Sequence, residues 1–352
     1  MILVQNIYWM LSYAFETLNE QGYKRCAKEN FDNALDLLSS ILEKGLTYQV
    51  KRGVNKYYVE KQESLNTLRG KIDIQGTIQN RIRQTQKLDC IYEEFSINTY
   101  FNQIIKTTVE SVLLVSKDVK NKDALKRLMV YFKDVDILPL RGINWKLHFD
   151  RNNQSYRMLL YICHLIVDGM IQSTQDGNIK LLDYIEEKHL AHLYEKFILK
   201  YYQKHFSGKF KAEARQIKWA LDDENVDSLF LPEMQTDITL TNGYKVLIID
   251  AKYYPHNSSS GQFGKKTIHS HNIYQIFTYV KNKAAEDSSL EVGGLLLYAK
   301  TDDEQQVYGD YLISGNYIGA TTLDLSQDFQ TVKDKLDSIG NKFYMGEIKF
   351  FN

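Results

Sequence analysis

The spacing of apolar residues changes several times along the first half of the chain, and each change predicts a different element. Apolar positions recur with helical spacing near the N-terminus and again from Phe31 to Leu42, which predicts two helices, the second ending at Gly45. Residues 46–80 instead alternate, with glycines as turn points, and predict several short strands. Helical spacing then returns over 98–116, 122–134 and 155–170. We therefore expect a mixed α+β N-terminal domain with a small β region.

The second half of the chain opens with the most regular amphipathic pattern in the sequence. Its apolar residues lie on one face of a single helix: Leu190, Leu193, Tyr194, Phe197, Ile198 and Tyr201. A hairpin pattern follows over 234–249, then a helix around 273–280. Two apolar strand runs, 293–298 and 318–325, precede a final helix. This order of elements predicts an α/β domain.

The predicted hairpin places acidic residues at its open end. Residues 234–240 alternate, 246–249 form a short aliphatic run, and Asn242-Gly243 between them suits a two-residue turn. Such a turn sets Thr241 opposite Tyr244, and it therefore sets Asp237 opposite Ile248 with Asp250 as a diagonal neighbour. Because side chains alternate along a strand, we expect the two aspartates on one face of the sheet.

Asp237, Asp250 and Lys252 together predict a site for a hard divalent cation. Diagonal neighbours lie roughly 7–8 Å apart, so two carboxylates can converge on one ion. Mg²⁺ prefers carboxylate and water oxygens, and a bound water can attack a phosphodiester while a lysine stabilises the developing charge. The alternative is a surface hairpin with ordinary ion pairs. The apolar run that leads directly into Asp250 favours a functional site, because a charge seldom ends a buried strand without a role.

This segment resembles the core of PD-(D/E)xK nucleases, with Pro232 and Asp237 followed by Asp250-Ala251-Lys252, although the proline stands five residues before the aspartate. The chain also resembles the McrC nuclease subunits of McrBC-type, 5-methylcytosine-specific, GTP-dependent restriction systems. That likeness runs through blocks that recur in order along most of the chain: VQNIYWMLSYAF, LRGKIDIQGTI, INTYFNQIIK, PEMQTDI, IIDAKYY and HSHNIYQ.

The resemblance implies a function and a set of partners. It implies a restriction-endonuclease-like C-terminal domain that cuts double-stranded DNA with Mg²⁺, or with Mn²⁺ in its place. It further implies that the N-terminal domain docks on a hexameric AAA+ GTPase of the McrB type, which recognises modified DNA and translocates it. Two alternatives stay open. One is a stand-alone repair or mobile-element nuclease, and the other is a non-catalytic regulator of an AAA+ motor.

The resemblance also implies further site residues. Glu195, on the first helix of the nuclease domain, corresponds to a glutamate that often supplies an extra metal contact, although a helix glutamate is more often a surface residue. Gln275 and Tyr279 match a Gln-x-x-x-Tyr helix that packs against the metal site. Glu233, opposite Lys252 in the predicted register, is either a ligand or a partner for the lysine. His271, on the same helix face as Gln275, is more often structural than a general base.

Length and composition limit the architecture. At 352 residues, with 43% apolar and 25% charged residues, the chain is predicted to form two globular domains. The polar stretch Ser173–Gly177 predicts the boundary, which gives an N-terminal docking domain, 1–178, and an endonuclease domain, 179–352. Lys+Arg and Asp+Glu are both 44, and this balance argues against a free-standing, tight, non-specific DNA binder.

Several other features narrow the choice of compartment and cofactor. Three widely spaced cysteines without a metal-binding pattern predict reduced thiols in the cytoplasm. No apolar run approaches 18 residues, so we expect no membrane span. The stretch GQFGKKT departs from a phosphate-binding loop at Ser259 and Lys266, and we expect no nucleotide site. Two basic segments have two possible interpretations: the cluster Arg81, Arg83 and Lys87, and the loop Pro255–Lys266. Each is either an ordinary solvated surface or a contact with phosphate or a partner.

Overall fold

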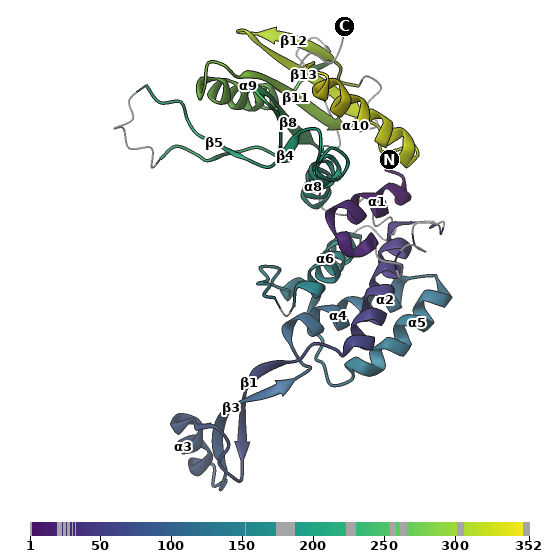
Figure 1. Cartoon of the computed structure of the whole chain (residues 1–352). Helices are drawn as coiled ribbons and strands as arrows, with labels where there is room; N and C mark the ends of the chain where they lie inside the picture. Colours follow the sequence, from purple (N-terminus) through teal and green to yellow (C-terminus); the bar gives the residue numbers. More distant parts are fainter. Residues whose placement is uncertain are drawn as a thin grey trace. The chain divides into compact units, whose positions relative to one another are not determined.

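The computed structural model of this chain divides into two units (Figure 1). Unit 1 comprises Met1–Asp32 and Ile185–Asn352, and unit 2 comprises Asn33–Tyr184. The structure describes residues 2–19, 23, 26, 29, 31, 33–151, 153–173, 187–222, 230–253, 258–260, 266–300 and 306–347.

This division differs from the predicted one at the N-terminus. The first 32 residues belong with the C-terminal unit, whereas the sequence pattern had grouped them with residues 33–178. The predicted boundary at 178/179 lies outside the described residues. Helix α1, Val4–Ala14, explains the difference, because Asn6 donates from Nδ2 to the carbonyl oxygens of Leu325 at 2.8 Å and of Gln327 at 2.7 Å. The ring of Trp9 also stacks on that of Phe329, with 4.8 Å between ring centroids.

Unit 2 contains a group of helices with a small antiparallel sheet at one end (Figure 1). Asn33, Thr99 and Asp118 each accept a backbone N–H from the first turn of the helix that follows, which fixes where these helices begin. The main helices are α2 (Ala34–Arg52), α4 (Tyr100–Val115), α5 (Val119–Met129) and α6 (Arg157–Ser173). Strands β1 (Tyr57–Leu65), β3 (Leu88–Ser96) and β2 (Lys71–Ile72) pair in that order, and α3 (Ile74–Ile82) lies against β3.

The prediction of strands over residues 46–80 is wrong at both ends of that range. Helix α2 continues through Gly45 to Arg52, because its glycine is buried within the helix and the surrounding packing outweighs the propensity of glycine to end a helix. Ile72 and Ile74 alternate, but Asp73 between them accepts hydrogen bonds from the backbone N–H groups of Gln75 and Gly76. Asp73 therefore caps a helix where the apolar alternation had predicted a strand.

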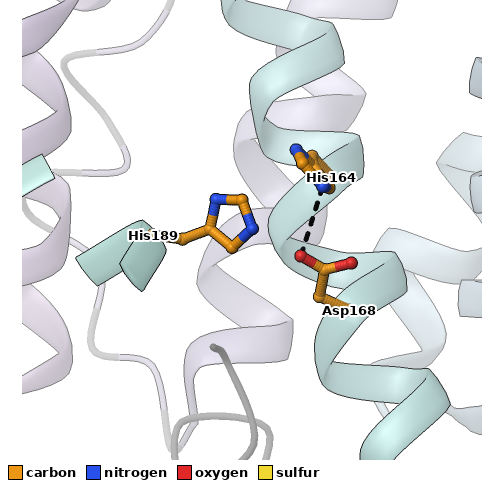
Figure 2. A group of neighbouring side chains, drawn as sticks. All are labelled: His164, Asp168 and His189. Atoms are coloured by element: carbon orange, nitrogen blue, oxygen red, sulfur yellow. Dashed lines mark ion pairs between the residues drawn. The ribbon is translucent and has the colours of Figure 1, made fainter. Parts of the chain in front are cut away.

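A histidine on α6 lies between a tryptophan and a carboxylate in unit 2. The ring of His164 stacks on that of Trp145, with 4.0 Å between centroids, and its Nε2 lies 3.3 Å from Oδ2 of Asp168 (Figure 2). Asp168 is one helical turn beyond His164, so the pair is a local helix contact. These contacts attach the segment around Trp145 to α6.

Unit 1 is built on a mixed sheet whose order, within the described residues, is β12-β13-β11-β8-β7-β4. Strand β11 is parallel to both β8 and β13, and the other pairs are antiparallel. The strands are β4 (Lys211–Glu213), β7 (Ile238–Asn242), β8 (Lys245–Lys252), β11 (Glu291–Ala299), β12 (Gly309–Ile313) and β13 (Asn316–Leu323). Two short strand pairs lie outside this sheet: β5 (Gln216–Ile217) with β6 (Met234–Gln235), and β9 (Ser258–Ser260) with β10 (Lys266–Ile268).

Three further helices pack on this sheet: α8 (Glu187–His205), α9 (Ser270–Ala285) and α10 (Phe329–Tyr344). The apolar face of α9, including Ile276 and Val280, forms one core cluster with Val246 and Ile248 of β8. On α8, Tyr202 donates its hydroxyl to the carbonyl oxygen of Leu336 on α10 at 3.2 Å. The α/β order predicted for the second half of the chain is therefore confirmed.

Two further observations concern the cysteines and the helices. Among the described residues Cys26, Cys90 and Cys163 form no disulfide, and all three are buried. Among the described residues, no helix combines the length and the apolar character that crossing a membrane requires.

Candidate active site

The turn between β7 and β8 sets the positions of the two aspartates. The observed pairing is Asn242 with Lys245, so Gly243-Tyr244 form the turn instead of the predicted Asn242-Gly243. Gly243 has a φ of 60°, and a turn that needs positive φ only at its first central residue accepts glycine there and tyrosine next. The register is thus two residues away from the predicted one. A shift of two preserves the face of every side chain, which is why Asp237 and Asp250 still lie on the same side.

Strand β8 carries Asp250 into the interior of unit 1. Val246 and Ile248 lie in the core cluster under α9, and Asp250 follows them on the same face of the strand. The neighbouring strands β7 and β11 lie on either side of β8, and Asp250 is only 2% exposed. An ionised carboxylate in such surroundings requires a cationic partner or a hydrogen-bond network.

Lys252 supplies the cation and is itself held in place by α9. Its Nζ lies 2.9 Å from Oδ2 of Asp250 and donates to Oε1 of Gln275 at 3.0 Å. Nε2 of Gln275 donates in turn to the hydroxyl of Tyr279 at 2.9 Å. The tyrosine therefore fixes the orientation of the carboxamide, so that its oxygen faces the lysine.

Asp237 lies immediately before β7, on the other strand of the hairpin. Its Oδ2 accepts the backbone N–H of Ala251 at 2.9 Å, so its carboxylate is attached to the strand that carries Asp250 and Lys252. The structure thus brings together four residues predicted from the sequence: Asp237, Asp250, Lys252 and Gln275.

Burial disfavours the ionised form of both aspartates. Burial is the largest cause that raises the pKa of Asp237, from 3.8 to about 8, and the charges of Asp250 and Glu195 add to it. Burial also raises the pKa of Asp250, which the neighbouring Lys252 ammonium opposes. A site that holds two carboxylates in a poorly solvated position attracts a cation that would neutralise both.

Glu195 occupies an outer position relative to this pair. It projects from α8, its charge is felt at both aspartates, and its Oε2 lies 3.7 Å from Nδ1 of His192. Among the described residues, Glu195, Asp237 and Asp250 do not form a group whose ligand atoms all lie within 4.8 Å of one another. The structure therefore places Glu195 beside the site but outside a tight three-carboxylate cluster.

Two other candidates are exposed side chains. Glu233 is exposed and accepts a hydrogen bond from Nε2 of Gln216 at 3.1 Å, because the β7–β8 pairing begins only at Ile238 and residues 234–235 pair with β5 instead. His271 is exposed at the start of α9. Of the predicted loop Pro255–Lys266, only 258–260 and Lys266 lie within the described residues.

Sequence reasoning missed a buried polar pair next to the lysine. Nδ2 of Asn272 donates to the hydroxyl of Tyr298 at 2.9 Å, and Tyr298 is the partner of Lys252 across the parallel β8–β11 register. Asn272 is three residues before Gln275 and seven before Tyr279, so all three lie on one face of α9. That helical spacing was present in the sequence, but an asparagine carries no distinctive chemical signal.

The donor atoms at this site suit a hard divalent ion. Asp237 and Asp250 offer only oxygen ligands, and the buried Oδ2 of Asp250 lies 2.9 Å from the Lys252 ammonium. Such oxygens are the ligands that Mg²⁺ and Mn²⁺ accept in proteins. The residues present therefore fit the expected ion.

Comparisons with known proteins agree with the resemblance read from the sequence. A restriction enzyme of Escherichia coli (strain K12), the type IV methyl-directed restriction enzyme EcoKMcrBC, is 28% identical over 348 residues, which cover 97% of this chain and 98% of that protein.

Two solved structures from Thermococcus gammatolerans are also similar in part. One is a half-complex of McrB AAA+ hexamers with bound McrC, which matches with a TM-score of 0.46 and 17% identity over 95% of this chain and 76% of that chain. The other is the McrBC complex, with a TM-score of 0.36 and 20% identity over 53% and 58%. The model of the McrBC 5-methylcytosine restriction system component family matches residues 5–299, and this chain belongs to that family.

Proposed function

We propose that this chain is the Mg²⁺-dependent DNA endonuclease subunit of a McrBC-like, modification-dependent restriction system. The observation that carries the proposal is the convergence of Asp237, Asp250 and Lys252 at one end of the β7–β8 hairpin. Gln275 accepts a hydrogen bond from this lysine. This arrangement corresponds to the PD-(D/E)xK pattern that the sequence indicates. Membership of the McrBC family supports the biological setting.

Each residue of the site has a distinct role in this proposal. A Mg²⁺ ion held by Asp237 and Asp250, with Glu195 as an outer contributor, would supply a polarised water and neutralise phosphodiester charge. Lys252 offers a compact positive charge to the attacking water and to the transition state. Gln275 accepts a hydrogen bond from Lys252 and holds its ammonium over the reacting phosphate. Tyr279 keeps the Gln275 carboxamide in the orientation that allows this.

The proposed partner is a hexameric AAA+ GTPase of the McrB type, and the small sheet of unit 2 with α3 is the proposed docking element. Helix α3 has no buried residue, and its apolar side chains face outward: Ile74, Ile78 and Ile82 are 71%, 54% and 76% exposed. Its inner side is polar, with Asn80 donating from Nδ2 to Oγ of Ser64 at 3.0 Å. An apolar stripe that faces solvent is typical of a surface covered by another protein.

A reconstitution experiment tests the proposal. The purified chain is mixed with an AAA+ GTPase of the McrB type, GTP, Mg²⁺ and plasmid DNA that is either methylated or unmodified. We expect double-strand cleavage only with the methylated plasmid, the partner and GTP together. Cleavage of any plasmid without the partner favours the stand-alone nuclease. Stimulated GTP hydrolysis without cleavage under every metal tested favours the non-catalytic regulator.

A further inference from the structure

A buried asparagine and a buried tyrosine join α9 to β11 beside the candidate active site. Nδ2 of Asn272 donates to the hydroxyl of Tyr298 at 2.9 Å, and the two residues are only 1% and 0% exposed. Asn272 lies in the first turn of α9, and Tyr298 lies near the end of β11. The proposed mechanism makes no use of this pair.

The register of the sheet sets Tyr298 next to Lys252. Strand β11 is parallel to β8, and these two residues are partners in that ladder. Tyr298 belongs to the core cluster that contains Ile276 of α9. Lys252 donates to Gln275 of the same helix. The tyrosine and the lysine therefore leave neighbouring strands on the face that α9 covers (Figure 1).

Two hydrogen bonds to neighbouring strands hold one side of α9. Asn272 and Gln275 are three residues apart, so they stand on the same side of the helix. The asparagine is bonded to Tyr298 of β11, and the glutamine accepts from Lys252 of β8 at 3.0 Å. A displacement or rotation of the first turn of α9 would therefore move Gln275 away from the lysine.

A glycine lets α9 lie close to β11. Gly294 lies under the helix, where an added Cβ would be 2.7 Å from Cγ1 of Ile276 and 2.9 Å from Cγ2 of Val280. Carbon atoms in ordinary contact are about 3.5–4.0 Å apart, so a larger residue at this position would push the helix outward. The glycine thus sets the height of α9 above β11, and the Asn272–Tyr298 bond limits its movement along the strand.

The polar pair contributes less to stability than to the position of the helix. An apolar pair of similar shape would fill this space at nearly equal free energy, because a buried hydrogen bond gives little net stabilisation. A hydrogen-bonded buried pair instead favours one arrangement of the surrounding side chains over its alternatives. Such a preference matters beside a lysine whose ammonium group has to be placed within a fraction of an ångström.

We propose that Asn272 and Tyr298 are positioning residues for Lys252. They fix the first turn of α9 on β11, and this turn places Gln275 as the acceptor for the Lys252 ammonium. This inference rests on the proposed nuclease function, because the place of the ammonium matters only where it acts on a reaction. Both residues act through the lysine and not on the substrate.

The test removes the hydrogen bond from either side in the full chain. Tyr298→Phe deletes the hydroxyl and keeps the ring, and Asn272→Ala deletes the donor. The matched control is Tyr202→Phe, which changes a buried tyrosine of the same unit whose hydroxyl donates to Leu336 on α10. Thermal melting measures the stability of all three variants.

The first readout needs no cleavage. The chain alone is treated briefly with acetic anhydride, and mass spectrometry follows acetylation of Lys252, whose side chain is 13% exposed. Loss of the Gln275 contact should release the amine. We expect acetylation of Lys252 to be roughly fivefold faster in Tyr298→Phe and Asn272→Ala, the factor that one net hydrogen bond provides, and unchanged in the control. Unchanged acetylation in both variants would overturn the proposal.

The second readout is the rate of methylated-plasmid cleavage with the McrB-type partner, GTP and Mg²⁺. We expect Tyr298→Phe and Asn272→Ala to cut between roughly tenfold and 100-fold more slowly, the scale for a group misplaced by about 1 Å, with GTP hydrolysis unchanged. In a Gln275→Ala background, Tyr298→Phe should have no further effect, because residues that act through one contact are not additive. Rate losses that multiply, or a normal rate in Tyr298→Phe whatever its acetylation, would overturn the proposal.

The two readouts separate this inference from the proposed function. Faster acetylation of Lys252 in a chain that never cuts DNA would confirm that the pair positions the lysine and would reject the nuclease. Normal acetylation and normal cleavage in both variants would keep the nuclease and reject the positioning role. A lower melting temperature as the only change would make the pair an ordinary part of the core and would also reject that role.

Discussion

Helix α3 of unit 2 and the β8–α9 pair of unit 1 both violate the usual rule of apolar interior and polar surface, in opposite directions. On α3, the isoleucines face outward and the polar residues face the sheet, where Thr77 accepts the backbone N–H of Asp89 through Oγ1 at 2.9 Å. At β8, Asp250 lies in the interior next to apolar residues. The first pattern concerns a surface that another protein would cover. The second concerns a polar site that the fold keeps from water.

The comparison shows that the two violations have different costs. Exposed isoleucines cost the folded chain little, because they lose nothing relative to the unfolded state. A buried carboxylate costs more, and the fold offsets it with Lys252, Gln275 and the Ala251 N–H. Changes at α3 should therefore affect partners and leave stability intact, whereas changes at the aspartates should affect both catalysis and stability.

The largest expected effect is on cleavage by Lys252 variants. Lys252→Ala should lower the cleavage rate by at least roughly 10²–10³-fold, the scale for removing one group that stabilises transition-state charge. Lys252→Arg should also be slow, because a planar guanidinium does not place one compact charge at the same point. The measurement is single-turnover cleavage at saturating Mg²⁺, with metal binding by calorimetry as the control for an intact site. Near-normal cleavage by either variant would contradict the assigned role.

A smaller effect is expected on docking when the exposed stripe of α3 becomes polar. Ile74→Ser together with Ile78→Ser should reduce stimulation of the partner's GTP hydrolysis at least tenfold while the chain alone melts as before. Substitutions at exposed positions usually change the free energy of unfolding by no more than about 0.5 kcal/mol. The matched control is Val119→Ser with Val130→Ser, two exposed apolar residues elsewhere in unit 2. Full stimulation by the α3 variant would remove α3 from the docking surface.

The smallest effect concerns the pH dependence of stability without metal. The pKa of Asp237 is raised from its ordinary value of 3.8 to about 8 in the folded chain. Between about pH 4 and pH 8 the folded chain therefore holds a proton that the unfolded chain releases. The stabilising contribution of this group is complete below about pH 4 and is lost as the pH rises through 8. Asp237→Asn should therefore melt higher than the unaltered chain at pH 8, by about 2–4 °C for each kcal/mol gained.

The control for this prediction is the same comparison at low pH. At pH 5 the unaltered carboxyl is already protonated, so the advantage of Asp237→Asn should shrink. An advantage that stays the same at both pH values would show that Asp237 is not the titrating group. Thermal melts in the presence of EDTA measure the difference directly.

The sequence predicted which side chains lie together better than it predicted the backbone register. Periodicity alone placed Asp237, Asp250 and Lys252 on one face, and this survived an incorrect turn because a two-residue shift keeps every side chain on its face. Glu233 is not part of the site, because residues 234–235 pair with β5 and the β7–β8 ladder begins at Ile238. The precise turn could not be predicted, because Asn242-Gly243 and Gly243-Tyr244 both contain the glycine that the positive φ requires.

The division into units was harder to predict for a physical reason. Asn6 and Trp9 contact residues more than 300 positions away in the sequence, and no local pattern encodes such a contact. For α3, the apolar alternation of Ile72 and Ile74 competed with the capping aspartate between them, and the cap determined the structure. The outward orientation of its isoleucines could not be deduced, because helical spacing shows that residues share a face without showing where that face points.

The central claim is that docking and cutting belong to separate parts of one chain, and Asp250→Ala tests it most directly. Removing this carboxylate relieves repulsion with Asp237 and leaves α3 untouched, so the variant should fold. We would measure GTP hydrolysis by the AAA+ partner and cleavage of methylated plasmid in the same reaction. We expect full stimulation of GTP hydrolysis and no cleavage. Loss of GTPase stimulation, or persistent Mg²⁺-dependent cleavage, would contradict the account.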